Sequence, residues 1–394
     1  METIIAFGVI SLLIVIAPFF STLTRLPLVV VEILLGALAY YFGFFEHSES
    51  LKLIAHIGFL FLMFLCGLEV NLKSFTKMGQ DFLKKVGLYF LILYSITFVF
   101  VLIFELSYIY LAAFPVMSLG MIMTLIRDYG KDKIWLNLAL SVGILGELVS
   151  IGVLVILNGA YSYGLSFKLY ETLLALLLFL GAIVGILKIA NIIFWWFPTL
   201  KFLAIPKDST KNQDIRFSAM LLLIMIGIVS LLKLEAVLGA FLAGAILATY
   251  FHYQKGLVDK LNDFGFGFFI PLFFVYTGST LDISLILSDL EILKKVVLIV
   301  VCMLFLRILA AFIAYGKYFK SKKNTLLFAF SHSMPLTFLV ATAQLGKQFN
   351  AISTQEYYAF ILAALLEGIV FMVCIKLIYQ LPNKKSPCFL GARL

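Results

Sequence analysis

The chain has 394 residues, of which 63% are hydrophobic and 13% are charged, and its formal net charge is +9. Soluble domains contain about half apolar and about a quarter charged residues, so this composition excludes a soluble globular protein. It indicates a protein that crosses a membrane many times.

Thirteen apolar stretches are each long enough to cross a membrane as a helix. About 20 apolar residues span a hydrocarbon core of about 30 Å, and a helix satisfies its own backbone hydrogen bonds there. We therefore predict an all-α integral membrane protein, a single membrane domain over residues 1–394 with no soluble C-terminal domain. The spans are approximately residues 3–20, 26–43, 54–71, 83–104, 106–127, 134–157, 169–196, 213–233, 235–252, 264–281, 291–316, 322–346 and 353–380.

Lysine and arginine are distributed unequally between the alternate loops. If the N-terminus lies outside, 21 of these residues fall in cytoplasmic loops and six in outer loops. Cytoplasmic loops are typically the basic ones, so we predict the N-terminus outside and the C-terminus in the cytoplasm. This topology accounts for the net positive charge without a nucleic-acid partner.

The predicted spans at 106–127 and 322–346 each contain a proline near the middle. Pro115 lies in FPVMSLG at 114–120, and Pro335 lies in HSMPLTF at 332–338. Proline lacks an amide hydrogen and clashes with the carbonyl four residues earlier, so both helices are predicted to break in mid-membrane. Freed carbonyls and hydroxyl oxygens beside the breaks would suit a small cation, although prolines in membrane helices also simply kink them. The residues assigned to the two breaks are Pro115, Met117, Ser118, Ser331, Ser333, Pro335 and Thr337.

Three ionisable residues lie deep within predicted spans: Glu147, Arg307 and Glu367. Such residues are costly in a membrane and mark candidate functional sites. Glu147 is the one charge between Ile134 and Leu157. Burial disfavours its anion, so we predict that a proton and a cation compete for this carboxylate. Arg307 stays charged at physiological pH, and we expect it to have a structural role, paired with Glu367.

His332, beside the second break, is a candidate pH sensor, because an unperturbed imidazole titrates at about pH 6.5. The alternative is a histidine that only packs or forms a hydrogen bond beside the break.

The two prolines and two of the glutamates repeat at the same interval. Glu147 follows Pro115 by 32 positions, and Glu367 follows Pro335 by 32 positions. The two sets lie seven predicted helices apart, and seven is an odd number, so corresponding segments cross the membrane in opposite directions. This arrangement predicts the inverted repeats of a secondary transporter, with two broken helices at the substrate site.

Several ordered segments resemble the monovalent cation:proton antiporter family, in its Kef-type and Nap-type branch. They are RLPLVVVEILLGALA (25–39), FLFLMFLCGLEVNLKSFTKMG (59–79), MSLGMIMTLIRDYG (117–130), LEAVLGAFLAGAILA (234–248), FFIPLFFVYTGSTLDIS (268–284) and ALLEGIVF (364–371). The resemblance implies the sodium/proton antiporter fold of thirteen helices. It also implies moving core helices at about 83–157 and 291–380, scaffold and dimerisation helices at about 3–71 and 213–281, and a linker helix at about 169–196.

The resemblance also implies the site and its setting. Glu147 falls where the family places its ion- and proton-binding carboxylate, Ser118 and Ser150 are assigned to the same site, and Arg307 falls where the family has a basic residue. The family usually has aspartate at the first of these positions, after Asn, Asp or Gln; here Gly146 precedes Glu147. Met117 stands where Thr or Ser is expected. A homodimer in a bacterial inner membrane is implied.

We predict that the chain exchanges protons for Na⁺, K⁺ or Li⁺ by an elevator-like movement of the core helices, without a cofactor. Electroneutral exchange of one proton per cation is expected, because Gly146 supplies no second titrating group. Two alternatives are a Kef-type gated potassium efflux protein with a separate regulatory subunit, and a degenerate membrane protein that does not transport. No catalytic triad, metal cluster or phosphate loop is apparent in the sequence, so an enzyme is not expected.

Overall fold

The structure, a computed structural model, describes residues 2–24, 26–69, 79–130, 132–164, 212–232, 236–251 and 255–380, with single positions between 174 and 196. The predicted linker span at 169–196 therefore lies largely outside the described residues. The described helices are α1 (Glu2–Thr24), α2 (Leu28–Tyr41), α3 (Glu49–Glu69), α5 (Gln80–Ile103), α6 (Tyr110–Ala113), α7 (Leu119–Tyr129), α8 (Ile134–Tyr163), α11 (Gln213–Leu231), α12 (Ala236–Phe251), α13 (Lys255–Phe264), a π-helix η1 (Gly265–Phe269), α14 (Ile270–Ser279), α15 (Ile283–Ser288), α16 (Leu290–Phe319), α17 (Lys322–His332), α18 (Leu336–Gln348) and α19 (Thr354–Gln380).

The described part of the chain is helical and contains no strand. Within it, seven helices are long and apolar enough to cross a membrane, and the apolar segments Leu28–Tyr41 and Ala236–Thr249 are shorter. Large apolar side chains on the outside of these helices, such as Leu12, Leu223 and Leu298, are more than half exposed. A membrane protein presents such side chains to lipid. The prediction of an all-α membrane protein is confirmed.

The spans that contain Pro115 and Pro335 are broken rather than kinked. The first is divided into α6 and α7, with extended backbone at Ser118 (φ −139°, ψ 136°). The second is divided into α17 and α18, which are separated by Ser333, Met334 and Pro335. In each case the proline has no amide to continue the helix, and a new helix begins within four residues.

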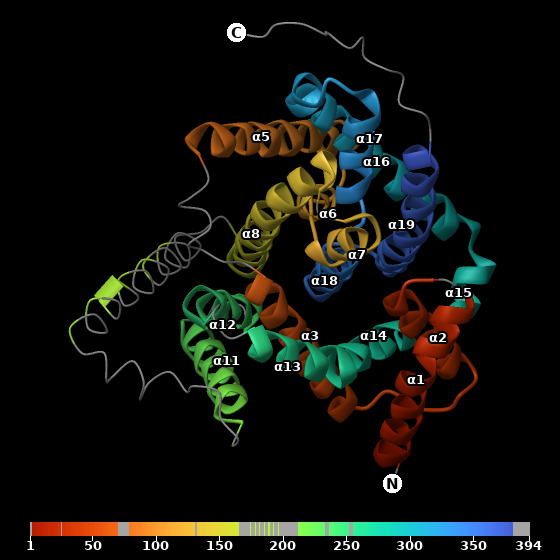
Figure 1. Cartoon of the computed structure of the whole chain (residues 1–394). Helices are drawn as coiled ribbons and strands as arrows, with labels where there is room; N and C mark the ends of the chain where they lie inside the picture. Colours follow the sequence, from red (N-terminus) through yellow and green to blue (C-terminus); the bar gives the residue numbers. More distant parts are fainter. Residues whose placement is uncertain are drawn as a thin grey trace, which may run out of the picture.

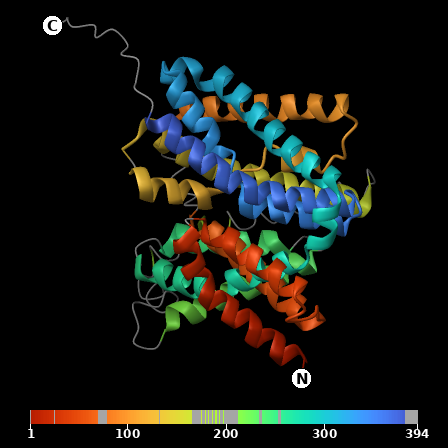
Figure 2. The ribbon, with the colours of Figure 1, turned by 90° about the vertical axis from the view of Figure 1, so that its right-hand side faces the viewer.

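The helices form two bundles, one above the other in Figure 2. The first bundle contains α1–α3 and α11–α14, and its closest pairs are α3 with α12 and α2 with α14. The second bundle contains α5–α8 and α16–α19, with α16 packed on α5, α17 and α19. The half-helices α6, α7, α17 and α18 lie together inside the second bundle (Figure 1).

Four glycines allow the closest helix pairs of the first bundle to approach backbone to backbone. A Cβ atom at Gly36 of α2 would clash with the carbonyl of Val275 in α14, and one at Gly278 of α14 would clash with that of Ile33 in α2. The α3–α12 pair is built in the same way, with Gly67 facing Phe241 and Gly244 facing Phe64. Small residues at such positions are typical of tightly packed membrane helices.

The pairing of elements follows the inverted repeat. When the predicted spans are compared at an interval of seven, α2 corresponds to α12 and α3 corresponds to α14. The α2–α14 contact in one half of the comparison therefore corresponds to the α12–α3 contact in the other. In the same way, the α7–α8 contact corresponds to the α18–α19 contact, and both pairs are present. The element predicted at 264–281 differs from the structure, because its helical path begins earlier, at Lys255, and passes through η1 before α14.

Candidate functional site

The first break is held against α8 by two side-chain acceptors. The backbone amide of Leu119, the first residue of α7, donates to Glu147 Oε1 at 2.9 Å. The amide of Met117 donates to Ser150 Oγ at 3.1 Å. The first amides of a helix have no partner within the helix, so α8 supplies acceptors for the amides that the break releases.

Glu147 is completely buried, and its carboxylate lies at the N-terminus of α7. A helix N-terminus carries a partial positive charge and favours a negative group. The break therefore creates a local environment that stabilises one buried carboxylate. Ser118, assigned to the site from the sequence, is the residue that precedes α7 and is also buried.

Arg307 joins the two broken helices from α16. Its side chain is completely buried, and Nη1 donates to the carbonyl of His332 at 2.5 Å. Nη2 donates to the carbonyls of Phe114, at 2.9 Å, and Val116. The carbonyls of Phe114 and Val116 come just after the C-terminus of α6, and that of His332 is at the C-terminus of α17. A helix carries a partial negative charge at its C-terminus. One guanidinium thus satisfies acceptors from both breaks.

The expected direct pairing of Arg307 with Glu367 is not formed. Between these two described residues there is no ion pair within 4.0 Å, and neither carboxylate oxygen of Glu367 has a hydrogen-bond partner among the described residues. Glu367 is nevertheless completely buried on α19. The physical reason is the fork of donors on arginine, which here bonds three carbonyls that only the breaks make available.

The hydroxyl groups at the second break donate to their own helix. Ser331 Oγ donates to the carbonyl of Phe328 at 2.7 Å, and Ser333 Oγ donates to that of Ala329 at 2.8 Å. Both side chains are buried. Thr337 lies in the first turn of α18, and its side chain is outside the described part of the structure. The second break thus differs from the first, where the hydroxyl of Ser150 accepts from a neighbouring segment.

His332, the last residue of α17, is buried and packs against aromatic rings. Its Nδ1 lies 3.1 Å from the carbonyl of Phe328, and its ring centroid lies 4.4 Å from that of Phe328 and 6.4 Å from that of Tyr89. Its carbonyl is the one that accepts from Arg307. The histidine therefore contributes a backbone acceptor to the crossing of the two broken helices.

Gly146 and Met117 occupy the same small space beside Glu147. A Cβ atom placed on Gly146 would lie 3.1 Å from Cβ and 3.2 Å from Cγ of Met117, and closer still to its sulfur. Met117 is completely buried. The Met117 side chain thus occupies the space that a side chain at position 146 of α8 would need.

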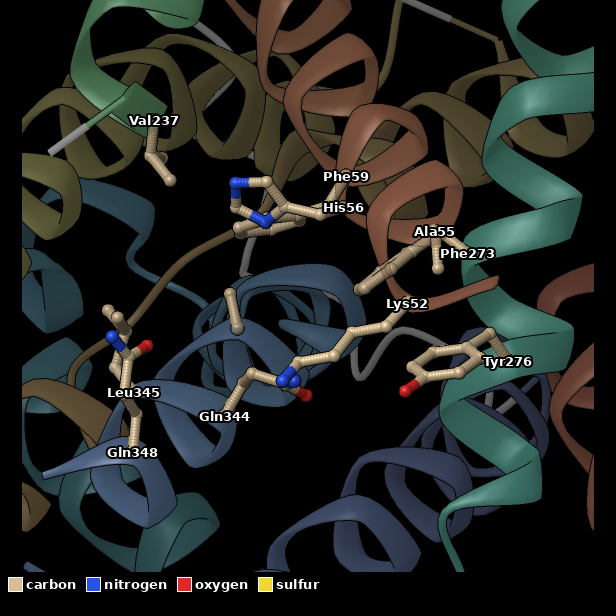
Figure 3. A pocket seen from close by; sticks show the side chains of 11 residues that line it. Lys52, Ala55, His56, Phe59, Val237, Phe273, Tyr276, Gln344, Leu345 and Gln348 are labelled. Atoms are coloured by element: carbon tan, nitrogen blue, oxygen red, sulfur yellow. The ribbon is translucent and has the colours of Figure 1, made fainter. Parts of the chain in front are cut away.

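A cavity of about 160 Å³ lies between the two bundles (Figure 3). Its polar side chains are Lys52 and His56 of α3, Tyr276 of α14, and Gln344 and Gln348 of α18. The first bundle thus contributes one wall and the half-helix α18 the other. Neither Glu147 nor Arg307 is among the residues that line it.

The sequence did not reveal the backbone groups of the site. The amides of Met117 and Leu119 and the carbonyls of Phe114, Val116 and His332 make its hydrogen bonds, and residue type says nothing about such groups. The prolines were the available signal, because a break must release amides and carbonyls nearby. In the described residues, no three His, Cys, Asp or Glu side chains form a metal-binding group.

A family model described as "Sodium/hydrogen exchanger, transmembrane" matches residues 9–380. The chain is 27% identical to the putative Na⁺/H⁺ antiporter YjbQ of Bacillus subtilis over 93% of its own length, and it spans 62% of that relative. It is 26% identical to the Na⁺/H⁺ antiporter of Enterococcus hirae, covering 94% of this chain and 97% of that one.

The probable Na⁺/H⁺ antiporter 3 of Methanocaldococcus jannaschii is 26% identical over 86% of this chain and 87% of its own length. Among solved structures, the sodium proton antiporter MjNhaP1 of the same organism, at pH 8, has a similar fold. The TM-score is 0.64 at 15% identity, covering 95% of this chain and 97% of that one.

Proposed function

The chain belongs to the sodium/hydrogen exchanger family of transmembrane proteins, and we propose that it exchanges protons for monovalent cations across a membrane. The observation that carries this proposal is the buried Glu147 carboxylate at the N-terminus of α7. The relatives reported above bear the names of Na⁺/H⁺ antiporters. These names favour exchange over the gated potassium efflux alternative.

Glu147 binds either a proton or a cation, and the two compete. An empty carboxylate carries a net negative charge, which is costly to move across the membrane, so the site crosses when it is loaded. The amide of Leu119 lowers the cost of the anion, and Ser118 and Ser150 are the neighbouring hydroxyl groups. Alternate loading from the two sides converts a proton gradient into a cation gradient.

One proton is exchanged per cation, and the exchange is electroneutral. Gly146 supplies no second titrating group beside Glu147, and Arg307 stays charged while bonded to three carbonyls. The second bundle carries the site and moves as an elevator against the first bundle. The first bundle forms the homodimer, and the chain lies in a cell inner membrane with its N-terminus outside and its C-terminus in the cytoplasm.

The test uses a pH-sensitive dye in inverted membrane vesicles. After acidification, NaCl, KCl or LiCl is added in turn to vesicles with the wild-type chain or the Glu147→Gln variant. We expect cation-dependent dequenching for the wild type and none for the variant. Exchange by the Glu147→Gln variant at the wild-type rate would contradict the assignment of the site. The absence of any response in the wild type would favour a protein that does not transport. A potential-sensitive dye tests the stoichiometry, because electroneutral exchange leaves its signal unchanged.

A further inference from the structure

One face of α8 carries the groups that meet the first break. Gly143, Gly146, Glu147 and Ser150 are spaced at three, four and seven residues, which places them on the same side of a helix. A Cβ atom at Gly143 would lie 2.9 Å from Ile122 Cδ1 and 3.0 Å from Leu119 Cδ2. Both glycines on this face are therefore in close contact with the broken segment or with the start of α7.

The space beside Gly146 is too small for a Cβ atom, and Met117 lines it from its own Cβ atom outward. Met117 Cβ and Cγ lie 3.1 and 3.2 Å from the position of a Cβ atom on Gly146. Both distances are shorter than normal contacts, and the completely buried Met117 has no solvent into which it could move. A side chain at 146 would therefore displace the segment from α8.

The same residues determine the two hydrogen bonds of the site. The amide of Met117 reaches Ser150 at 3.1 Å, and the amide of Leu119 reaches Glu147 at 2.9 Å. Protein N–H···O hydrogen bonds have lengths of about 2.7–3.2 Å, and at about 3.6 Å the bond is lost. Displacement of the segment by several tenths of an ångström would therefore loosen the donor that holds the carboxylate.

We propose that Gly146 and Met117 are a size-matched pair of positioning residues, which together fix the distance between the broken segment and Glu147. This inference rests on the proposed function and assigns the pair to the same ion-binding site. The bulk of Met117 keeps the site filled, and the absence of a side chain at 146 lets the segment reach α8. The pair thus sets the cation affinity of the carboxylate.

The test is a double-mutant cycle on cation affinity in vesicles. Gly146→Ala is made in the wild type and in the Met117→Ala variant, and the cation KM and maximal rate are measured for all four proteins. In the wild type, the added methyl meets Met117, and we expect the cation KM to rise by about tenfold, because small displacements at a site are expensive. In the Met117→Ala background, the sulfur and Cγ are gone and only Cβ remains, at 3.1 Å, so we expect a smaller change, of less than about threefold.

Gly152→Ala is the matched control, because it lies on α8 and a Cβ atom there would meet nothing within 4 Å. We expect this control to leave KM unchanged. A general loss of folded protein would lower the maximal rate at constant KM, so KM separates positioning from stability.

Gly146→Leu is the second variant of the pair, since its larger side chain cannot be accommodated by a rotation of the methionine alone. Equal effects of Gly146→Ala in both backgrounds, or an unchanged KM in both Gly146 variants, would overturn the pairing. If the wild type shows no exchange at all, it is the proposed function that fails.

Discussion

At the residue scale, the site depends on one carboxylate and the backbone of a broken helix. Glu147 accepts a hydrogen bond from the first amide of α7, and Ser150 accepts from the extended segment that precedes it. Both acceptors come from α8, one turn apart. The break therefore does more than release backbone groups, because it attaches the segment to the helix that bears the carboxylate.

Ser150→Ala tests the second of these bonds. The substitution removes the acceptor of the buried Met117 amide, which costs about 1 kcal/mol or more. We expect the cation KM to rise by about fivefold, since about 1.4 kcal/mol corresponds to a factor of ten. Exchange assays in vesicles at a range of cation concentrations would measure the KM.

Ser141→Ala serves as the control on the same helix, because Ser141 Oγ donates to the carbonyl of Asn137 within α8 at 3.0 Å. The control should retain the wild-type KM. An unchanged KM in Ser150→Ala would show that this hydrogen bond has no part in holding the site.

Substitution of Arg307 should destabilise the folded protein. Arg307→Met leaves the carbonyls of Phe114, Val116 and His332 without their donor, and each buried unsatisfied group costs about 1–3 kcal/mol. We expect a large decrease in the thermal unfolding temperature of the detergent-solubilised protein. Arg307→Lys keeps the charge and a hydrogen-bond donor, so its unfolding temperature should lie between those of the wild type and Arg307→Met. A wild-type unfolding temperature for Arg307→Met would contradict this structural role.

The sequence singled out the carboxylate of the candidate site but not the groups that bond to it. Glu147 could be found because it is one charge in a long apolar span. Its partner is a backbone amide, and the partners of Arg307 are backbone carbonyls, which no residue type reveals. The predicted pairing of Arg307 with Glu367 is not a direct ion pair for the same reason, because the breaks provide carbonyl acceptors within hydrogen-bond distance of the guanidinium.

At the element scale, the two bundles contact each other through a polar link near the cavity. Thr280 Oγ1, just after α14, lies 2.9 Å from the Tyr357 hydroxyl of α19. The same hydroxyl donates to Gln344 Oε1 of α18 at 3.4 Å. Lys347 of α18 lies above the Tyr357 ring, 4.3 Å from its centroid. This link connects the first bundle to two helices of the second.

Tyr357→Phe should accelerate exchange if the second bundle moves against the first. The link must then break during transport, and a hydrogen bond contributes about 1 kcal/mol. We expect the maximal rate to rise by up to about fivefold with little change in the cation KM. The measurement is the rate of dye dequenching at saturating cation.

Tyr318→Phe is the matched control, because Tyr318 is a half-exposed tyrosine of α16 in the second bundle. A rate for Tyr357→Phe equal to that of the control would indicate that the link persists throughout the transport cycle.

The broken helices were predictable from the sequence, whereas the path into α14 was not. Pro115 and Pro335 mark the two breaks, since proline removes an amide hydrogen-bond donor from the helix, although α1 continues through Pro18. The π-helix at Gly265–Phe269 is followed by Pro271 in the first turn of α14, yet no break occurs there. It continues the helix from α13 into α14, and a pattern of apolar residues does not distinguish this path from a helix that begins at 264.

At the scale of the whole molecule, one shared site makes protons inhibitors of cation binding. Both ligands occupy the Glu147 carboxylate in the proposed exchange. Lowering the pH by one unit raises the proton concentration tenfold, so the apparent cation KM should rise by up to about tenfold where protons dominate. Initial rates across a range of cation concentrations and pH values would measure this competition. A maximal rate that falls with pH at constant KM would instead indicate separate sites.

The glycine contacts of the first bundle also affect how the protein is assembled in the cell. Val275 is made 239 residues after Gly36, and Phe241 is made 174 residues after Gly67. During translation, α2 and α3 are therefore made before the helices that pack against their glycine faces. A chain that ended before α12 would therefore leave the glycine faces of α2 and α3 without these partners.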